Sequence, residues 1–191
     1  MAKLPPPRTI GTMSVEEALD RRRSKRSFSR KGLSPEQISQ LLWSGQGMVG
    51  RGLRTAPSAG ATYPLELYLV TAQGVYHYRP ETNEIEPVLE GDVRPQLCRA
   101  CLGQEWIEGA PVSIVIAGVY ERTAQRYGPR ASRYVHMEAG HAAQNIHLQA
   151  VAIELGSVPV GAFRDEQVQE VLCFAEDHHP LYIISVGYPA E

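Results

Sequence analysis

Residues 137–155 read MEAGHAAQNIHLQAVAIEL and form the longest helical pattern in the chain. The apolar residues of this stretch fall on two faces: Ala139, Ala142, Ala143, Ile146, Ala150 and Ile153 on one, and Leu148, Val151, Ala152 and Leu155 on the other. A helix that is apolar almost all round has to be covered on both sides. We therefore expect a long central helix at the interface of a homodimer, ending at Gly156.

Shorter patterns on either side of this helix mix helices with strands. Ser14 with Glu17, and Ser34 with Gln37, predict the starts of two short amphipathic helices. Residues 65–69 alternate as a strand. We expect the other elements to be a hairpin partner over 75–78, an exposed strand or loop over 81–91, helices over 93–102 and 165–173, buried strands over 114–119, 158–163 and 181–186, and a mobile polar loop over 124–132. Because strands and helices do not alternate regularly, an α+β fold is favoured over a doubly wound one.

Charge is distributed unevenly along the 191 residues, although the formal net charge is only −2. Residues 1–60 carry an excess of seven positive charges, and residues 61–191 carry an excess of nine negative charges. Of the 19 basic residues 16 are Arg, a side chain suited to binding phosphate. The near-zero total argues against nucleic acid or an anionic membrane as a partner.

Length and composition predict one globular domain. We expect it to span residues 14–191, after an N-terminal extension over residues 1–13. No apolar run approaches the ~20 residues of a membrane helix, and the first residues lack the apolar core of a signal peptide. Cytoplasmic localisation is therefore expected. Three cysteines are too few for a disulfide framework.

Two motifs match cofactor or metal patterns in spacing but not in context. Residues 45–50 read GQGMVG, yet a helix precedes them and a loop follows, whereas a dinucleotide site needs a strand before and a helix after. Glu138 with His141, and Glu176 with His179, have the spacing of di-iron ligands, but no further long helices are predicted to complete such a site. We expect no metal. Glu138 and His141 are expected to form hydrogen bonds in a buried interface, and His178 and His179 to lie in a surface turn.

Three other stretches suit a flat, phosphate-bearing ligand. Residues 22–28 read RRSKRSF, in which Arg22 and Arg26 are four residues apart at a helix end and can clamp a phosphate. Residues 57–64 read PSAGATYP, and residues 159–163 read PVGAF. The small side chains of these two stretches let backbone groups approach a ring closely.

Together, in this order and spacing, the three stretches resemble the FMN-dependent nitroreductase family. The resemblance runs from about Ser14 to Tyr188. Residues 57–66, Gln104-Glu-Trp106, and Arg133-Tyr134 with residues 138–145 are most similar to the SagB-type dehydrogenase branch, which includes oxidases that form thiazole and oxazole rings. The resemblance implies a sandwich of a mixed, mostly antiparallel sheet flanked by helices, with the long helix at the interface of a homodimer.

The resemblance also implies the cofactor-binding residues. The phosphate and ribityl chain of FMN would be held by Arg22, Ser24 and Arg26, with Arg23 adjacent. The loop of Pro57, Ser58 and Ala59 would pack on the flavin bound mainly by the other subunit. The turn of Val160, Gly161 and Ala162 would lie over the isoalloxazine ring, and Gln104 would contact the ring edge. Relatives carry a basic segment beyond the last strand; here Arg22 and Arg26 are expected to neutralise the phosphate alone or with Arg130 or Arg133.

The implied function is hydride exchange between flavin N5 and NAD(P)H or a small organic substrate. Azoline oxidases of this branch carry a Lys-Tyr pair, in whose place this chain has Arg133 and Tyr134. Arg stays protonated and cannot be a general base, so Tyr134 is the candidate catalytic residue. Three alternatives stay open: oxidation of a peptide-derived or azoline-like substrate, a catalytically silent flavin-binding protein, and a Rossmann NAD protein.

Overall fold

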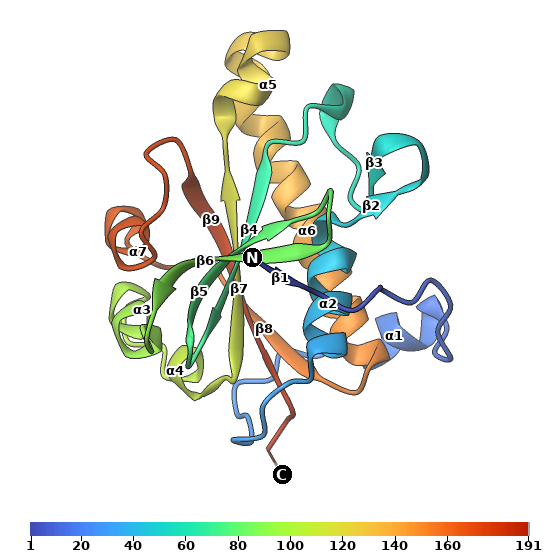
Figure 1. The fold of residues 1–191 in the computed structure, drawn as a ribbon, viewed down its shortest axis with the longest axis vertical. Coiled ribbons are helices and arrows are strands. Elements are labelled where there is room, and N and C mark those ends of the chain that lie inside the picture. The colour runs from blue at the N-terminus through green and yellow to red at the C-terminus, as the bar shows by residue number, and fades with distance from the viewer. Residues whose placement is uncertain (191) are drawn as a thin grey trace.

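The protein, described here as a computed structural model covering residues 1–190, is built on one seven-stranded sheet (Figure 1). The strands lie in the order β1-β6-β5-β4-β7-β9-β8, and every neighbouring pair is antiparallel. Their bounds are β1 Ala2–Lys3, β4 Leu65–Thr71, β5 Gly74–Arg79, β6 Glu84–Glu90, β7 Val112–Gly118, β8 Gly156–Val160 and β9 His179–Gly187. A separate two-stranded ribbon joins β2 Met48–Val49 to β3 Leu53–Arg54. The expected α+β fold with a mostly antiparallel sheet is confirmed.

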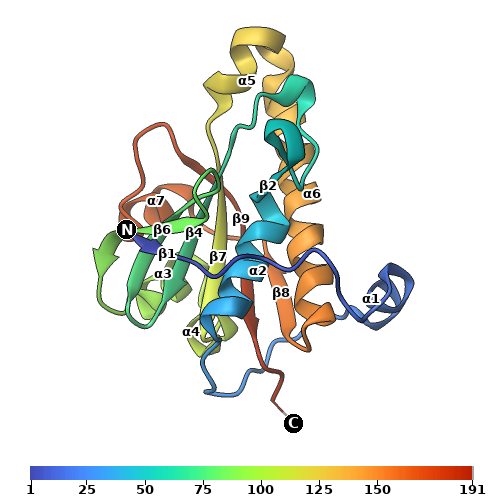
Figure 2. The same cartoon turned by 45° about the vertical axis from the view of Figure 1, so that its right-hand side comes forward.

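Two layers of helices cover the sheet. The helices are α1 Val15–Arg21, α2 Pro35–Gln46, α3 Arg94–Ala100, α4 Trp106–Gly109, α5 Tyr120–Tyr127, α6 Ala131–Ala152 and α7 Asp165–Val171, with single 3₁₀ turns η1 Gly50–Gly52, η2 Ala59–Ala61 and η3 Gly128–Arg130. The view in Figure 2 separates α2 and α6 on one face from α3, α4 and α7 on the other. On β4, Leu65, Leu67 and Leu69 pack in the core toward α2 and α6, and Tyr68 and Val70 pack in the other core. Both faces of this central strand are therefore buried.

The predicted capping signals set the starts of the first two helices. The Ser14 hydroxyl accepts a 3.1 Å hydrogen bond from the backbone N–H of Glu17. Ser34 and Gln37 form a complete capping box, with Pro35 in the first turn. Each cap satisfies backbone donors that the first turn of a helix leaves free.

The long helix α6 begins at Ala131, six residues before the predicted stretch. The prediction of a mobile loop over residues 124–132 was wrong, since α5, η3 and the start of α6 occupy it. The residues are polar because this end of the molecule projects beyond the sheet, as the top of Figure 1 shows. Thr123 and Ala131 are the buried residues of α5, η3 and the first turn of α6, and because neither is large and apolar, the composition resembles that of a loop.

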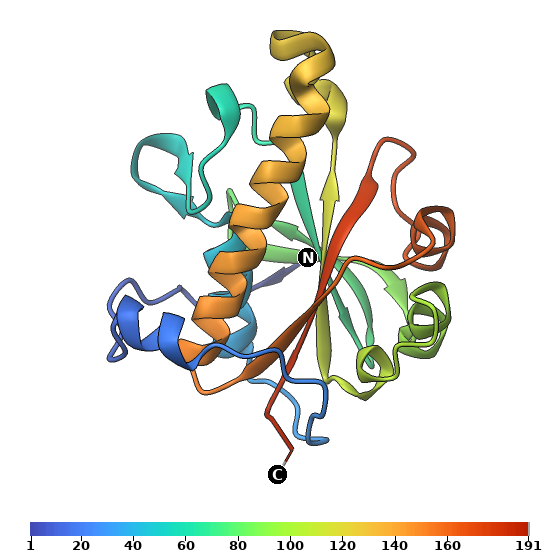
Figure 3. The ribbon, with the colours of Figure 1, turned by 180° about the vertical axis from the view of Figure 1, so that it is seen from behind.

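One face of α6 is covered by the chain and the other is not. Ala139, Ala142 and Ile146 lie in the core, whereas the Met137 side chain is 54% exposed. Gly140 and His141 are also exposed. Seen from behind in Figure 3, α6 runs the height of the molecule with no other element in front of its middle.

The first residues of the chain are part of the sheet. β1 pairs with β6, and Leu4 is buried in the core. Among residues 1–190, no helix is long and apolar enough to cross a membrane.

Candidate functional site

The arginine-rich segment follows α1 and runs beside the edge strand β8. The backbone of Ser24 forms a parallel bridge with Ser157, and the N–H of Lys25 donates to the Ser157 carbonyl at 3.0 Å. Arg22 is half-buried at the end of α1, and Arg23 and Arg26 are exposed. Within the described part of the chain, these three guanidinium groups form no ion pair with a carboxylate. Three neighbouring cations without a counter-ion are available to bind an anion.

The same segment meets the predicted stretch of Gln104–Trp106 through Arg26. Its guanidinium lies over the Trp106 ring, 5.3 Å from the ring centroid. From the turn before α4, Gln104 Nε2 donates at 2.8 Å to the carbonyl of Ala162. The structure therefore gathers Arg26, Trp106, Gln104 and Ala162 at one place, which we call the β8 site together with Arg22, Ser24 and residues 160–161.

The strand-end turn in the β8 site is open to a ligand. Val160 is buried, whereas Gly161 and Ala162 are exposed. A methyl group added to Gly161 would meet only the Tyr182 ring, at 3.7 Å. Beside this turn, the indole Nε1 of Trp106 is buried without a hydrogen-bond partner. A buried N–H without a partner is costly, so this donor is suited to a bound ligand.

The predicted loop of Pro57, Ser58 and Ala59 lies away from the β8 site. It packs beside α5, where the Gly60 carbonyl accepts a hydrogen bond from Arg126 Nη1 at 3.3 Å. Gly60 has φ 58°, and a Cβ there would lie 2.7 Å from the Tyr127 hydroxyl. Figures 1 and 3 show this segment, between β3 and β4, toward the α5 end of α6, whereas the segment after α1 lies at the opposite end. Within one chain, the loop of Pro57, Ser58 and Ala59 is therefore separate from the β8 site.

Tyr134 lies at the same end of α6 as the loop of Pro57, Ser58 and Ala59. It lies in the first turn of α6, half-buried, with its ring edge-on to Tyr127 at a centroid distance of 5.0 Å. We call Tyr134, Tyr127 and residues 57–61 the α5 site.

A buried carboxyl group lies beneath the α5 site. Glu138 is 2% exposed, and its Oε1 has no hydrogen-bond partner. Burial raises the pKa of Glu138 to about 7, although Ser58, Arg54 and Gln46 lie close enough to favour its charged form. The expected burial of Glu138 is thus found, but His141 is exposed and does not share its environment. The sequence signal for the buried Glu138 was an acidic residue on an otherwise apolar face of the predicted helix.

A second buried network ties α5 to the sheet. The Glu66 carboxylate accepts a hydrogen bond from His77 Nε2 at 2.7 Å and forms a 2.5 Å ion pair with Arg122 of α5. Burial opposes the charge of Glu66, but His77 and Arg122 outweigh it and lower the pKa of Glu66 to about 2. The network fixes the helix that carries part of the α5 site.

His178 is also placed differently from the prediction. It is buried, not in a surface turn, and its Nδ1 shares a 2.6 Å hydrogen bond with the Tyr68 hydroxyl. The partner comes from β4, more than 100 residues earlier, so local sequence could not indicate it.

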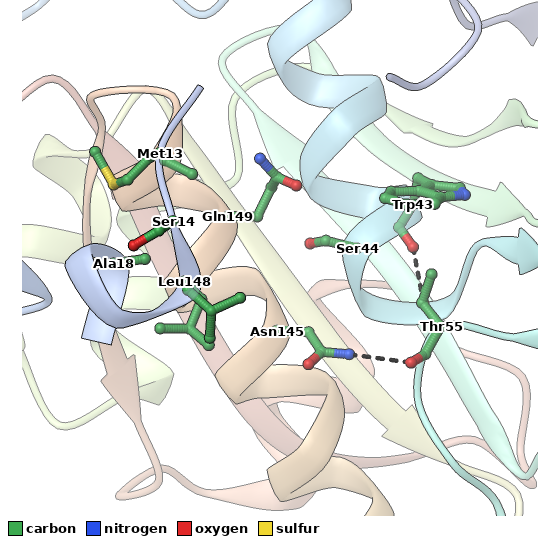
Figure 4. Close-up of a pocket in the computed structure, with 11 residues that line it drawn as sticks. Met13, Ser14, Ala18, Trp43, Ser44, Thr55, Asn145, Leu148 and Gln149 are labelled. Atoms are coloured by element: carbon green, nitrogen blue, oxygen red, sulfur yellow. Dashed lines mark hydrogen bonds between the residues drawn. The ribbon is translucent and has the colours of Figure 1, made fainter. Parts of the chain in front are cut away.

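An apolar groove of about 310 Å³ lies between α1, the end of α2 and α6. In Figure 4, Ala18 and Leu148 line one side of it, and Trp43 and Thr55 line the other. Close to it on α1, Val15 and Leu19 are 65% and 52% exposed. The groove is an apolar surface that one chain leaves open, whereas the exposed face of α6 combines Met137 with Gly140, His141 and Gln144.

The GQGMVG motif lacks the strand that a dinucleotide site requires. Gly45 lies inside α2 and Gly47 ends that helix, so no strand enters the GQGMVG motif. No group of three or more His, Cys, Asp or Glu side chains within residues 1–190 is placed to hold a metal ion.

Comparison with known proteins identifies the family. A model of the nitroreductase family matches residues 19–188. The chain belongs to the nitroreductase family. This nitroreductase-family protein is 42% identical over 189 residues to MJ1384 of Methanocaldococcus jannaschii, provisionally named a nitroreductase, covering 95% of this chain and 94% of MJ1384.

Solved structures extend the comparison. A provisionally named nitroreductase of Ralstonia eutropha JMP134 has a TM-score of 0.89 at 29% identity, over 100% of this chain and 90% of that chain. A chain in the Escherichia coli microcin synthetase McbBCD complex has a TM-score of 0.79 at 25% identity, over 96% of this chain and 76% of that chain. McbC, a microcin B17-processing protein of E. coli, is 28% identical over 130 residues, which cover 62% of this chain and about half of McbC (48%). The nitroreductase-family protein described here is an oxidoreductase enzyme.

Proposed function

We propose that this protein is a homodimeric, FMN-dependent oxidoreductase that exchanges a hydride between the flavin and NAD(P)H or a small organic substrate. The observation that carries the proposal is the β8 site. Arginines without counter-ions lie beside an open strand-end turn and a buried indole N–H that lacks a partner. These features suit the two ends of FMN, an anionic phosphate and a flat ring with polar edges.

Each part of the β8 site has a role in this proposal. Arg22, Ser24 and Arg26, with Arg23 adjacent, bind the phosphate and ribityl chain by charge-assisted hydrogen bonds. Gln104 holds the turn of Val160, Gly161 and Ala162 in place through the Ala162 carbonyl. Gly161 leaves room for the ring. When bound, FMN supplies hydride chemistry at N5, while the protein fixes its orientation.

A homodimer would complete the site. The loop of Pro57, Ser58 and Ala59 and the candidate catalytic Tyr134 lie toward the other end of α6 from the arginines. A second copy related by a two-fold axis could place its α5 site against the β8 site of the first. The groove in Figure 4 and the exposed Met137 of α6 supply apolar surface for that contact.

Flavin binding is the first test. The purified protein should carry flavin absorbance or bind added FMN, and replacing Arg22 and Arg26 together by Ala should abolish that binding. Arg99→Ala, at an exposed arginine on α3, is the matched control and should bind FMN as the wild type does. Absence of FMN binding by the wild type would eliminate this proposal, and full retention by the double variant would refute the phosphate assignment.

The dimer is tested by light scattering after gel filtration. Met137→Glu places a charge on the exposed face of α6 and should give monomers that bind FMN weakly. Gln96→Glu, exposed on α3 against the other face of the sheet, should remain dimeric. A wild-type protein that is monomeric at micromolar concentration would contradict the shared site.

A second candidate is oxidation of a peptide-derived or azoline-like substrate. The similarity to McbC and to the McbBCD complex favours it. Oxidation of NADH and NADPH with a nitroaromatic acceptor separates the two candidates. Rapid turnover supports a nicotinamide-driven reductase, whereas FMN binding with slow turnover of both nicotinamides supports the azoline-like substrate.

A further inference from the structure

A buried histidine lies behind the edge strand of the β8 site. His147, on the inner face of α6, is 5% exposed. Its Nδ1 shares a 2.7 Å hydrogen bond with the Ser157 hydroxyl. Its Nε2 is also buried and has no partner. A buried polar atom without a partner is destabilising, so its retention requires an explanation.

The surroundings of His147 are those of the arginine-rich segment. Ser157, which holds the imidazole, is also the residue whose backbone pairs with Ser24 and accepts from Lys25. Arg22 is close enough for its charge to act on the ring. Burial and that charge lower the pKa of His147 to about 4, so the imidazole is neutral near pH 7. We assign the Ser157 hydroxyl as the donor to Nδ1, and this assignment leaves the hydrogen of the neutral imidazole on the unpartnered Nε2.

We propose that His147 is a further ligand of the FMN phosphate, with Nε2–H donating to a phosphate oxygen that Arg22 also binds. The inference rests on the proposed function and adds a donor to the arginine-rich segment. The positive charge of Arg22 disfavours protonation of the imidazole. A phosphate bound to Arg22 would offset that charge. Ser157 then acts as a positioning residue, since its hydroxyl is bonded to Nδ1 and holds the orientation of the ring.

A comparison of FMN with riboflavin tests the assignment, because riboflavin lacks the phosphate. The protein stripped of flavin is titrated with each, and dissociation constants are measured from the quenching of flavin fluorescence. His147→Leu should weaken FMN binding about 10- to 100-fold, the range for a hydrogen bond to a charged group, and leave riboflavin binding within about twofold. His147→Gln, which can still donate, should recover part of the loss. His179→Leu, at an exposed histidine at the start of β9, is the control.

Two results would overturn the inference without touching the proposed function. One is an equal loss of affinity for both flavins in His147→Leu, which indicates a packing role. The other is no loss for either flavin. If the wild type binds neither flavin, the proposed function fails and the inference fails with it.

A measurement on the unmutated protein covers the case in which the variants do not fold. In a ¹⁵N-labelled sample, FMN should bring the His147 Nε2–H resonance to a hydrogen-bonded, downfield position, and riboflavin should not. The same resonance position with both flavins would refute the phosphate contact.

Discussion

The side-chain Nε2 of Gln104 and the backbone carbonyl of Ala162 are joined by a 2.8 Å hydrogen bond across 58 residues of sequence. The same Nε2 donates to the carbonyl of Cys101 at 2.8 Å. One amide group therefore holds the turn before α4 against the turn after β8. These two turns lie where Arg26 packs on Trp106. The position of the open turn depends on a side chain far from it in sequence.

Gln104→Leu should weaken FMN binding by about tenfold, because the turn of residues 160–162 loses the bond that fixes its carbonyl. Fluorescence titration of the stripped protein measures the effect. Gln96→Leu, an exposed glutamine of α3 without a hydrogen bond among the described residues, should bind FMN as the wild type does. Equal affinities for the Gln104 variant and the wild type would show that the turn holds its position unaided.

Tyr134→Phe should lower turnover at least tenfold and leave the dissociation constant for FMN unchanged. Proton transfer by a positioned side chain typically contributes about 10²–10⁴-fold to a rate. The ring remains in place against Tyr127, so packing is preserved. Steady-state kinetics on the flavin-loaded dimer give the answer, and unchanged turnover would remove Tyr134 from the catalytic assignment.

Glu138 should make the protein less stable as the pH rises. Its pKa is about 7 in the folded chain and near 4.5 when unfolded, so between these values only the folded state holds the proton. The free energy of unfolding then falls with rising pH across this window, by roughly 3 kcal/mol in total. Urea unfolding at pH 5 and pH 8 measures the change.

Glu138→Gln removes the titrating group and keeps the shape of the side chain. The variant should show a smaller fall in unfolding free energy between pH 5 and pH 8 and should be the more stable protein at pH 8. A pH dependence identical to that of the wild type would mean that Glu138 is already ionised at pH 5.

Glu66→Gln should destabilise the protein by about 2–4 kcal/mol at pH 7, because His77 and Arg122 lose a charged partner that is largely buried. In the wild type, the stabilisation by Glu66 is present above pH 4.5 and is lost as the pH falls toward about 2. Thermal melts at pH 7 check the first statement, and melts between pH 5 and pH 2 check the second. Glu86→Gln breaks the exposed pair with Arg79 and should cost less than about 1 kcal/mol.

Local patterns were sufficient for most of the fold. Ser14 and Ser34 begin helices because their hydroxyl groups satisfy backbone donors within three residues. The alternation over residues 65–69 predicts a strand because leucines on one face pack against α2 and α6. The start of α6 and the helix α5 were missed because they contain few large apolar side chains, and their buried positions include Thr123 and Ala131.

The site was predictable only in part, for a related reason. The three small-residue and arginine stretches are contiguous and can be read directly from the sequence. Glu138 and His147, by contrast, have partners elsewhere in the chain. Ser58 approaches Glu138, and Ser157 forms a hydrogen bond with His147. Such pairings depend on how α6 lies against the loop and the edge strand, which periodicity does not encode.

Both edges of the sheet resist the addition of a further strand. Beyond β8, the backbone of Ser24 and Lys25 occupies the Ser157 position, and Pro159 within β8 has no N–H to offer. At the other edge, β1 covers only the start of β6, where Pro87 and the charged Glu86 and Glu90 follow. Short cover, proline and charge are the devices by which natural sheets avoid edge-to-edge aggregation. Growth into sheet-based filaments is thereby disfavoured even at high concentration, and self-association is left to surfaces formed by helices.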